Sequence, residues 1–487
     1  MIIGKSRIMK KKILTISLAL LAVSGFAQNE VDALRYSEND ITGTARFMGL
    51  SGAMSAMGND LSAITVNPAG VAVFNKTQLG FSTGIAGIVT EGKFLGQNSS
   101  ETKMNFNIGN AGIVARFKKK NKETGARGWN GFSMGLNYTR HQSFHRNSYF
   151  EGVNNRSSLI DQYVYDAEGT DFTQLNSFGS DLAWQTWLID TPAGGTSSYE
   201  RNVLDNYGHQ QQIQETTKGF KGQTDLSFGG NYANTLYIGG SIGYQNINYR
   251  SERNHTEIAP DDTSSGFREF TQTEFLRTSG SGVNLKFGVI YRPADWFRIG
   301  ASIHSPTFFN MEENYSASIV SVFDTVSYSA SSPEGSYNYK LQTPFRAIGG
   351  VAFVIARMAV ISVDYEHIDY SMARFRADDY SFSTENGNIK DYLKAVGSIR
   401  AGVEVKLKKF FIRGGFGMNS DPYSGEYDLN DSKYSLGFGW KGRHFMFDMA
   451  YQLQRENSNY LVYDAAIAPI DVVVSSHNVM ASVGVKF

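Results

Sequence analysis

The sequence is notable first for what it lacks. It contains no cysteine, only nine prolines among 487 residues, and equal numbers of basic and acidic side chains. Without cysteine, neither a disulfide framework nor a lipoprotein anchor at a cleavage-site cysteine is possible. The balanced charge gives no reason to expect a nucleic-acid partner. No run approaches the roughly 20 apolar residues of a membrane-spanning helix.

The longest apolar run lies in the first 27 residues. A basic start (Lys5, Arg7 and 10–12) precedes an apolar stretch over 13–23, and small residues surround Phe26. This order is typical of a secretory signal peptide. We therefore expect residues 1–27 to direct export and to be removed before Gln28. The rest of the chain then carries five more acidic than basic residues.

The residues that are abundant are glycine and the aromatics. Glycine accounts for 50 positions and aromatic residues for 13% of the chain. The end of the chain shows a clear pattern: from Val479 to Phe487, apolar side chains alternate with small or polar ones. A period of two places the apolar set on one face of a strand. Strands of this kind with a modest apolar average fit a membrane β-barrel, in which every second residue meets lipid, although a soluble β-sandwich can share the composition.

The same alternation recurs along the chain. The connections between these segments are alternately short turns and longer polar loops. This pattern favours a barrel with tight turns at one end and loops at the other. We predict an all-β fold, a transmembrane antiparallel barrel of 14 strands over residues 78–487. The segment 270–292 is long enough for two strands, and Pro344 predicts a bulge or kink. The expected strands lie near 78–88, 104–117, 131–142, 223–232, 235–249, 270–292, 296–315, 336–355, 359–372, 395–407, 410–418, 433–440, 444–455 and 477–487.

The longest connection runs from about Ser143 to Lys221. Apolar residues from Phe172 to Trp187 follow helical spacing, which predicts a short amphipathic helix. Its apolar face either packs the loop or lies open on the outer surface.

One stretch, Thr42–Phe74, stands apart from the strands. It is small, apolar and glycine-rich, and it ends in the turn-forming sequence Asn67-Pro68-Ala69-Gly70. A barrel of about 14 strands is wider than its own side chains can fill. We therefore expect residues 28–77 to form a plug.

The residues from Arg46 to Phe74, with their Asn67-Pro68-Ala69 motif, resemble the N-terminal hatch of the FadL/TodX family of outer-membrane transporters. The resemblance implies a hatch over 28–77 inside a 14-stranded barrel in the bacterial outer membrane. It also implies passive uptake of long-chain fatty acids or other hydrophobic small molecules, with hatch rearrangement and lateral release. The terminal Phe487 resembles the signal read by the barrel-assembly machinery.

The hatch supplies most of the candidate ligand contacts. Methionine suits variable ligands because its side chain is flexible and polarizable, although packing against the wall explains the same residues. Arg298, Arg346 and Arg400 are expected to face inward with Asp364, Glu366, Glu404 and Asp448, where ion pairs brace the barrel interior. The alternative is that an inward arginine binds a fatty-acid head group, because guanidinium binds carboxylate in a bidentate manner. The hatch motif is Asn67, Pro68 and Ala69, and the ligand candidates are Phe47, Met48, Met54, Met57, Leu61, Phe74 and Arg346.

Catalytic patterns occur only in the wrong context. The sequence G-x-S-x-G appears at 80–84, 131–135 and 239–243, each time inside an alternating strand instead of at a strand-to-helix turn. The eight histidines show no metal-ligand spacing. We expect no enzymatic activity, no cofactor and no metal. The expected partners are a hydrophobic ligand and outer-membrane lipid, and the barrel is expected to be a monomer. A non-specific porin and a surface adhesin or structural barrel remain the alternative functions.

Overall fold

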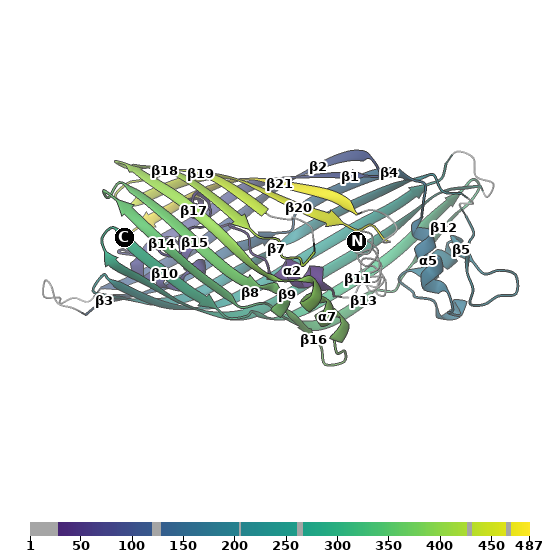
Figure 1. Cartoon of the computed structure of the whole chain (residues 1–487), viewed down its shortest axis with the longest axis horizontal. Coiled ribbons are helices and arrows are strands. Elements are labelled where there is room, and N and C mark those ends of the chain that lie inside the picture. Colours follow the sequence, from purple (N-terminus) through teal and green to yellow (C-terminus); the bar gives the residue numbers. More distant parts are fainter. Residues whose placement is uncertain (1–27, 119–127, 204–205, 261–265, 426–430, 464–468) are drawn as a thin grey trace, which may run out of the picture.

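The computed structural model describes residues 28–118, 128–203, 206–260, 266–425, 431–463 and 469–487. The expected signal peptide lies outside the described residues, so export remains a prediction. Within the described part, 14 wall strands form one antiparallel sheet that closes on itself (Figure 1). Closure is made by the first and last strands, β1 (Gln78–Phe94) and β21 (Ile470–Lys486), which pair from Gln78 with Lys486 to Lys93 with Asp471.

The predicted barrel of 14 strands is therefore confirmed. Between β1 and β21 the wall contains β2 (Gln97–Lys118), β3 (Trp129–Ser143) continued by β4 (Arg146–Asn154), β7 (His209–Tyr232), β8 (Leu236–Ile258), β9 (Phe267–Ala294), β10 (Phe297–His304) continued by β11 (Phe308–Phe323), β13 (Gly335–Gln342) continued by β14 (Arg346–Ile355), β15 (Ala359–Asp369), β17 (Ala395–Leu407), β18 (Phe410–Asn419), β19 (Asp431–Lys441) and β20 (Phe445–Tyr460).

The period-two pattern has the expected physical result. Outward side chains such as Val283, Leu285 and Phe287 on β9 are exposed, and the residues between them are buried against the interior. A wall with an apolar outside and a polar, glycine-rich inside is the reverse of a soluble protein and is typical of a membrane barrel. No helix among the described residues is long and apolar enough to cross a membrane.

Three wall strands are interrupted, two of them at proline. Pro306 separates β10 from β11 and Pro344 separates β13 from β14, because proline cannot donate to the ladder. The kink predicted at Pro344 is thus a complete break, and Thr307 and Thr343 bond to each other across it (2.9 and 3.0 Å). The segment 270–292 forms one continuous strand, β9.

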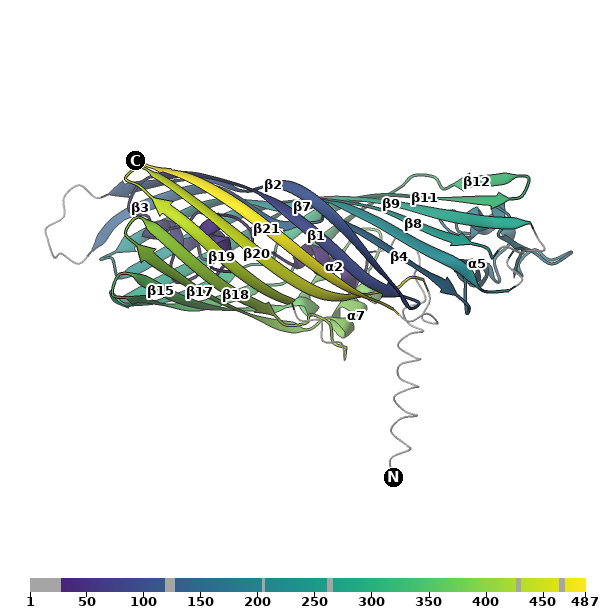
Figure 2. The same cartoon turned by 90° about the horizontal axis from the view of Figure 1, so that it is seen from above.

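The two ends of the barrel differ. Turns of two or three residues and the C-terminus lie at one end, here named the turn end, and longer connections lie at the other, the loop end (Figures 1 and 2). Two connections are exceptions. The one between β1 and β2 is a tight turn at Leu95-Gly96 at the loop end, where a longer loop was expected, and the one between β2 and β3, residues 119–128, is longer although it lies at the turn end. The residues that connect β15 to β17 at the loop end include η3 (Tyr370–Met372), β16 (Arg374–Arg376) and α7 (Ser383–Tyr392).

The largest connection, residues 155–208, is here named the outer insert. The helix predicted from Phe172 to Trp187 is wrong in its extent, since only η2 (Phe172–Gln174) and α6 (Ser180–Gln185) form there, with α5 (Leu159–Ala167) preceding them. The short strands β5 (Ile189–Asp190) and β6 (Glu200–Arg201) pair within the insert, and β12 (Ser327–Ser331) pairs with β11 beside it.

Residues 28–77, here named the N-terminal segment, lie inside the ring of strands (Figure 1). They form four short helices: α2 (Glu30–Ser37), α3 (Ala45–Gly49), α4 (Ala63–Val66) and η1 (Pro68–Val73). Local side chains start two of them, because Asn29 accepts a hydrogen bond from the Asp32 amide and Thr44 accepts one from the Phe47 amide.

Candidate functional site: the barrel lumen and a gap in its wall

Ion pairs join the N-terminal segment to the wall near the turn end. Arg46 of α3 binds Glu404 of β17 with two hydrogen bonds, from Nε (2.8 Å) and Nη2 (2.9 Å). Arg413 of β18 donates to the same carboxylate (2.7 Å) and to Asp448 (2.7 Å). Arg413 therefore bridges the predicted inward carboxylates Glu404 and Asp448, and Arg46 ties α3 to Glu404. The sequence patterns did not single out either arginine.

A second anchor lies at Ser55. Its amide and hydroxyl both donate to the buried carboxylate of Asp364 on β15, each at 2.7 Å. Arg298, predicted to form an ion pair, instead donates to the Met57 carbonyl (3.1 Å). The predicted inward charges thus hold the N-terminal segment as well as the wall.

Glycines on the inner face allow the backbone of the N-terminal segment to approach the wall. A Cβ atom at Gly288 would collide with the side chain of Asn67, and one at Gly239 would collide with the carbonyl of Pro68. A Cβ at Gly300 would likewise meet the carbonyl of Ser55. The glycine-rich face of the strands therefore provides space for the N-terminal segment.

The predicted motif forms a turn held from both sides. The Asn67 side chain accepts a hydrogen bond from the Ala69 amide (3.0 Å) and donates to the carbonyls of Ser55 (2.8 Å) and Val289 (3.2 Å). Pro68 opens η1, where its missing N–H costs nothing. One asparagine thus fixes the turn to β9 and to the preceding loop.

The apolar candidates from the sequence are all buried, and most of them pack. Phe47, Met54 and Met57 form one cluster with wall residues Ile348 and Ala352. Leu61 and Phe74 pack with Val114 in another. Their role in ligand binding stays a prediction.

Met48 differs from the others because it lines the large lumen cavity as well as packing against Met480 and Ala450. The guanidinium of Arg346 also reaches this cavity, but it already bonds Glu366 (3.0 Å) and the Ser37 carbonyl. Arg400 shares Glu366, so the inward arginine proposed for a ligand carboxylate is largely engaged.

The lumen cavity has a volume of about 940 Å³ and lies on the loop-end side of the N-terminal segment. Residues 29–42 and Met48 form its floor, and α5 and α6 of the outer insert form its roof through residues such as Tyr163 and Ser180. On one side it is lined by Ile88 of β1, Phe150 of β4, and Val472 and Val474 of β21.

The wall beside this cavity has a gap, here named the wall gap. In the described part of the chain β2 pairs with β3 only from Asn110 to Lys118, and β4 pairs only with β7. The half of β2 from Gln97 to Gly109 therefore lacks a ladder partner on that side. One side-chain hydrogen bond, from Asn105 to Ser143 (3.3 Å), crosses the interruption.

The two faces of the wall at this gap differ. Asn107 of β2 and residues 142–146 line the lumen cavity. On the outer face of the same half of β2, Met104 and Phe106 are 65% and 69% exposed. The cavity thus extends to the interrupted part of the ladder, whose outer face is apolar.

The N-terminal segment is tied to the rim of the wall gap. The Asp40 amide donates to the His141 carbonyl (2.7 Å), and the Thr42 hydroxyl donates to the Arg140 carbonyl. Both carbonyls belong to the part of β3 that has lost its β2 partner. The N-terminal segment is therefore in direct contact with this rim.

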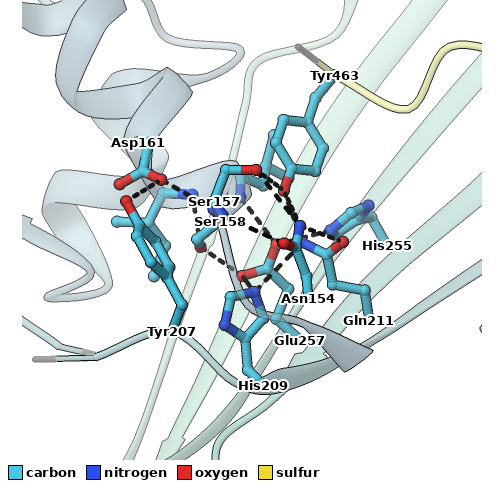
Figure 3. A network of polar contacts seen from close by, with 12 residues as sticks. Asn154, Ser157, Ser158, Asp161, Tyr207, His209, Gln211, His255, Glu257 and Tyr463 are labelled. Atoms are coloured by element: carbon cyan, nitrogen blue, oxygen red, sulfur yellow. Dashed lines mark hydrogen bonds and ion pairs between the residues drawn. The ribbon is translucent and has the colours of Figure 1, made fainter. Parts of the chain in front are cut away.

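A buried polar network fastens the roof to the wall (Figure 3). The Glu257 carboxylate of β8 accepts hydrogen bonds from the Ser158 hydroxyl, the Leu159 amide (2.8 Å) and Gln211 (2.7 Å). His255 Nε2 lies 3.0 Å and His209 Nε2 3.2 Å from the same group. This carboxylate lies at the N-terminus of α5, where negative charge interacts favourably with the helix dipole. The capping box Ser158-x-x-Asp161 was the sequence signal that could have located α5.

Comparison with known proteins gives a structural likeness and no sequence match: no family model and no curated protein matches this chain. The fold is similar to that of the Pseudomonas putida toluene transporter TodX, with a TM-score of 0.52 and 12% identity over 92% of this chain and 99% of that one. It is equally similar to a Pseudomonas aeruginosa FadL homologue, with a TM-score of 0.53 and 11% identity over 93% and 99%. The chain thus has a FadL/TodX-like fold.

Proposed function

We propose that this protein is an outer-membrane passage for small hydrophobic or amphipathic molecules, which enter beneath the outer insert and leave sideways through the wall gap. The proposal rests on the extent of the lumen cavity. The same cavity extends from the roof formed by α5 to the interrupted ladder between β2 and β3. A molecule in this cavity has a route to the lipid-facing surface.

The barrel is filled along its axis, which supports lateral release. Below the cavity, residues 45–74 are almost entirely buried and pack against the wall on several sides. A porin needs an open axial path, and the described residues fill it. The toluene transporter TodX shares the fold, which favours hydrophobic small molecules as cargo.

The N-terminal segment acts in this proposal as a hatch. Its bonds to the His141 and Arg140 carbonyls lie at the rim of the wall gap. A ligand on the cavity floor contacts residues 29–42, so it can displace the segment and change the width of the gap. The exported barrel would be inserted as a monomer by the barrel-assembly machinery, with the exposed Phe487 as its signal.

The test is to close the wall gap reversibly. Because the chain has no cysteine, the double variant Asn105→Cys/Ser143→Cys contains a single possible crosslink. In proteoliposomes, oxidation or a short bis-thiol reagent should abolish protein-dependent uptake of a hydrophobic fluorescent probe, and reduction of the disulfide should restore it.

The matched control places the crosslink within the intact ladder of the same two strands. Ile113 and Leu136 are direct partners in β2 and β3, so Ile113→Cys/Leu136→Cys should leave uptake unchanged after oxidation. Uptake that continues at its full rate through a crosslinked wall gap would refute lateral release. Steady ionic conductance of the unmodified protein in planar bilayers would favour a porin instead.

A further inference from the structure

The walls of the lumen cavity are more acidic than a pocket for hydrocarbon or for a fatty acid should be. Eleven carboxylate side chains line it, against seven arginine and lysine side chains. Several of the charges compensate one another, as in Asp32 with Arg35 and Glu274 with Arg253. The cavity nevertheless retains an excess of negative charge.

The excess is concentrated above the N-terminal segment. Glu38 after α2 and Glu456 of β20 line the cavity, and in the described part of the chain no hydrogen bond or ion pair joins either carboxylate. Asp40 and Asp431 line the same region, where Lys433 is the neighbouring cation (4.0 and 3.2 Å). Burial and nearby carboxylates, first among them Glu456, raise the pKa of Glu38 to about 8. Lys221, whose ammonium group donates to the Glu38 carbonyl, acts on this pKa in the opposite direction and offsets only part of the rise.

An apolar surface adjoins these carboxylates. Glu456 is the direct partner of Val474 in the β20–β21 ladder, and directly opposed residues face the same side of a sheet. Val474 belongs to a buried cluster with Val472, Ile88 and Phe150, all of which line the cavity. A hydrocarbon tail can therefore lie along this cluster while its head group reaches the carboxylates.

The roof adds two hydroxyl groups without partners. Tyr163 of α5 and Ser180 of α6 line the cavity and are only 4% and 2% exposed. Among the described residues neither hydroxyl has a hydrogen-bond partner. Buried hydroxyls normally have one, so these two indicate a ligand with groups that form hydrogen bonds.

A bound metal ion does not explain the arrangement. In the part of the chain that the structure describes, no three histidine, aspartate or glutamate side chains lie close enough to hold one. The carboxylates are spread along a wide cavity next to an apolar wall, which suits an extended organic molecule better than a point charge.

We propose that the lumen cavity selects amphiphiles with a positively charged amine head group, held by Glu38 and Glu456, over uncharged or carboxylate amphiphiles of the same length. This inference rests on the proposed function, because it names the class of cargo for the same passage. The ammonium group lies between the two carboxylates, and the alkyl chain lies along the cluster of Ile88, Phe150 and Val474. A fatty-acid carboxylate would meet repulsion at the same position.

The experiment compares three molecules that differ only in the head group. Octylamine, octanol and octanoate are equilibrated with the protein in lipid nanodiscs, and binding to empty nanodiscs is subtracted. We expect octylamine to bind at least 10-fold more tightly than octanol, and octanoate to bind most weakly. In Glu38→Gln/Glu456→Gln the preference for octylamine over octanol should fall to about twofold, with octanol binding unchanged. The control Glu312→Gln alters a carboxylate on the outer face of β11 and should keep the full preference.

The outcomes separate the two proposals. Equal binding of the three molecules, or tightest binding of octanoate, would overturn the amine preference and leave the passage proposal intact. An amine preference that survives in Glu38→Gln/Glu456→Gln would also overturn it. Loss of the preference only in that double variant supports it, while uptake through the wall gap is tested independently by the crosslink between β2 and β3.

Discussion

Replacing Glu404 with glutamine should release the N-terminal segment while the barrel remains folded. Glu404 is the only described carboxylate that bonds Arg46, and it receives both of that side chain's hydrogen bonds to the wall. Glutamine is nearly isosteric but has no charge. The change also leaves Arg46 and Arg413 near each other with less negative charge between them.

The magnitude follows from the burial of the pair. Side-chain exposure is 19% for Arg46 and 8% for Glu404. Removing one partner of a buried ion pair costs about 3–5 kcal/mol, and the low end applies because Arg46 retains a bond to the Asn59 carbonyl (3.1 Å). A loss of about 3 kcal/mol corresponds to about a 100-fold change in a local opening equilibrium.

Hydrogen–deuterium exchange with mass spectrometry measures this opening. In Glu404→Gln, amides of residues 44–60 should exchange about 100-fold faster than in the unmodified protein, with the strands β17 and β18 unchanged. The control Asp448→Asn removes a bond of Arg413 within the wall but no hydrogen bond of Arg46, and it should speed exchange of 44–60 far less. Unaltered exchange of 44–60 in Glu404→Gln would refute the role of this pair as an anchor. Faster exchange throughout the barrel would show that the pair stabilises the wall instead.

Three further predictions concern the turn, the roof and the cavity floor. Gly288→Ala should disrupt the Asn-Pro turn, because overpacking costs about 1–3 kcal/mol, and hydrogen exchange of the N-terminal segment should become faster. The control Gly349→Ala adds a methyl group in open space and should leave this exchange unchanged. Glu257→Gln places an amide N–H₂ group among hydrogen-bond donors, which should cost about 1–3 kcal/mol. Proteolysis of the outer insert should then become at least several-fold faster. The variant Glu252→Gln, at an exposed position, is the control. Because the pKa of Glu38 is raised to about 8, its carboxylate gains charge as pH rises through this value. Binding of octyltrimethylammonium, which does not titrate, should therefore strengthen between pH 7 and 9, and Glu38→Gln should reduce this rise.

Much of the barrel could be predicted because its wall is built from local alternation. Val479 to Phe487 and the other alternating segments were placed on the correct strands, since period two decides which face of a strand is apolar. The strand ends were less certain, because residues 97–103 of β2 and 209–218 of β7 lack an apolar outward face. The tight turn at Leu95-Gly96 was missed for this reason.

The candidate site was only partly foreseen. The sequence identified residues 42–74 as unlike the strands, and the inward charges Glu366, Glu404 and Asp448 were recognised as parts of ion pairs. The partners Arg46 and Arg413 were not, because pairing depends on which strands and which helix lie opposite each other. The large cavity, its acidic lining and the roof formed by α5 follow from contacts between residues far apart in the chain.

By itself, the sequence determined a closed β-barrel with an apolar outside, a glycine-rich inside and a distinct segment to fill it. Short-range periodicity and the width of a 14-stranded barrel are sufficient for those conclusions. The tertiary structure alone decided where the wall gap lies, how residues 40–42 reach its rim and which carboxylates remain unpaired. Those features depend on register and on long-range contacts, which no local pattern in the sequence records.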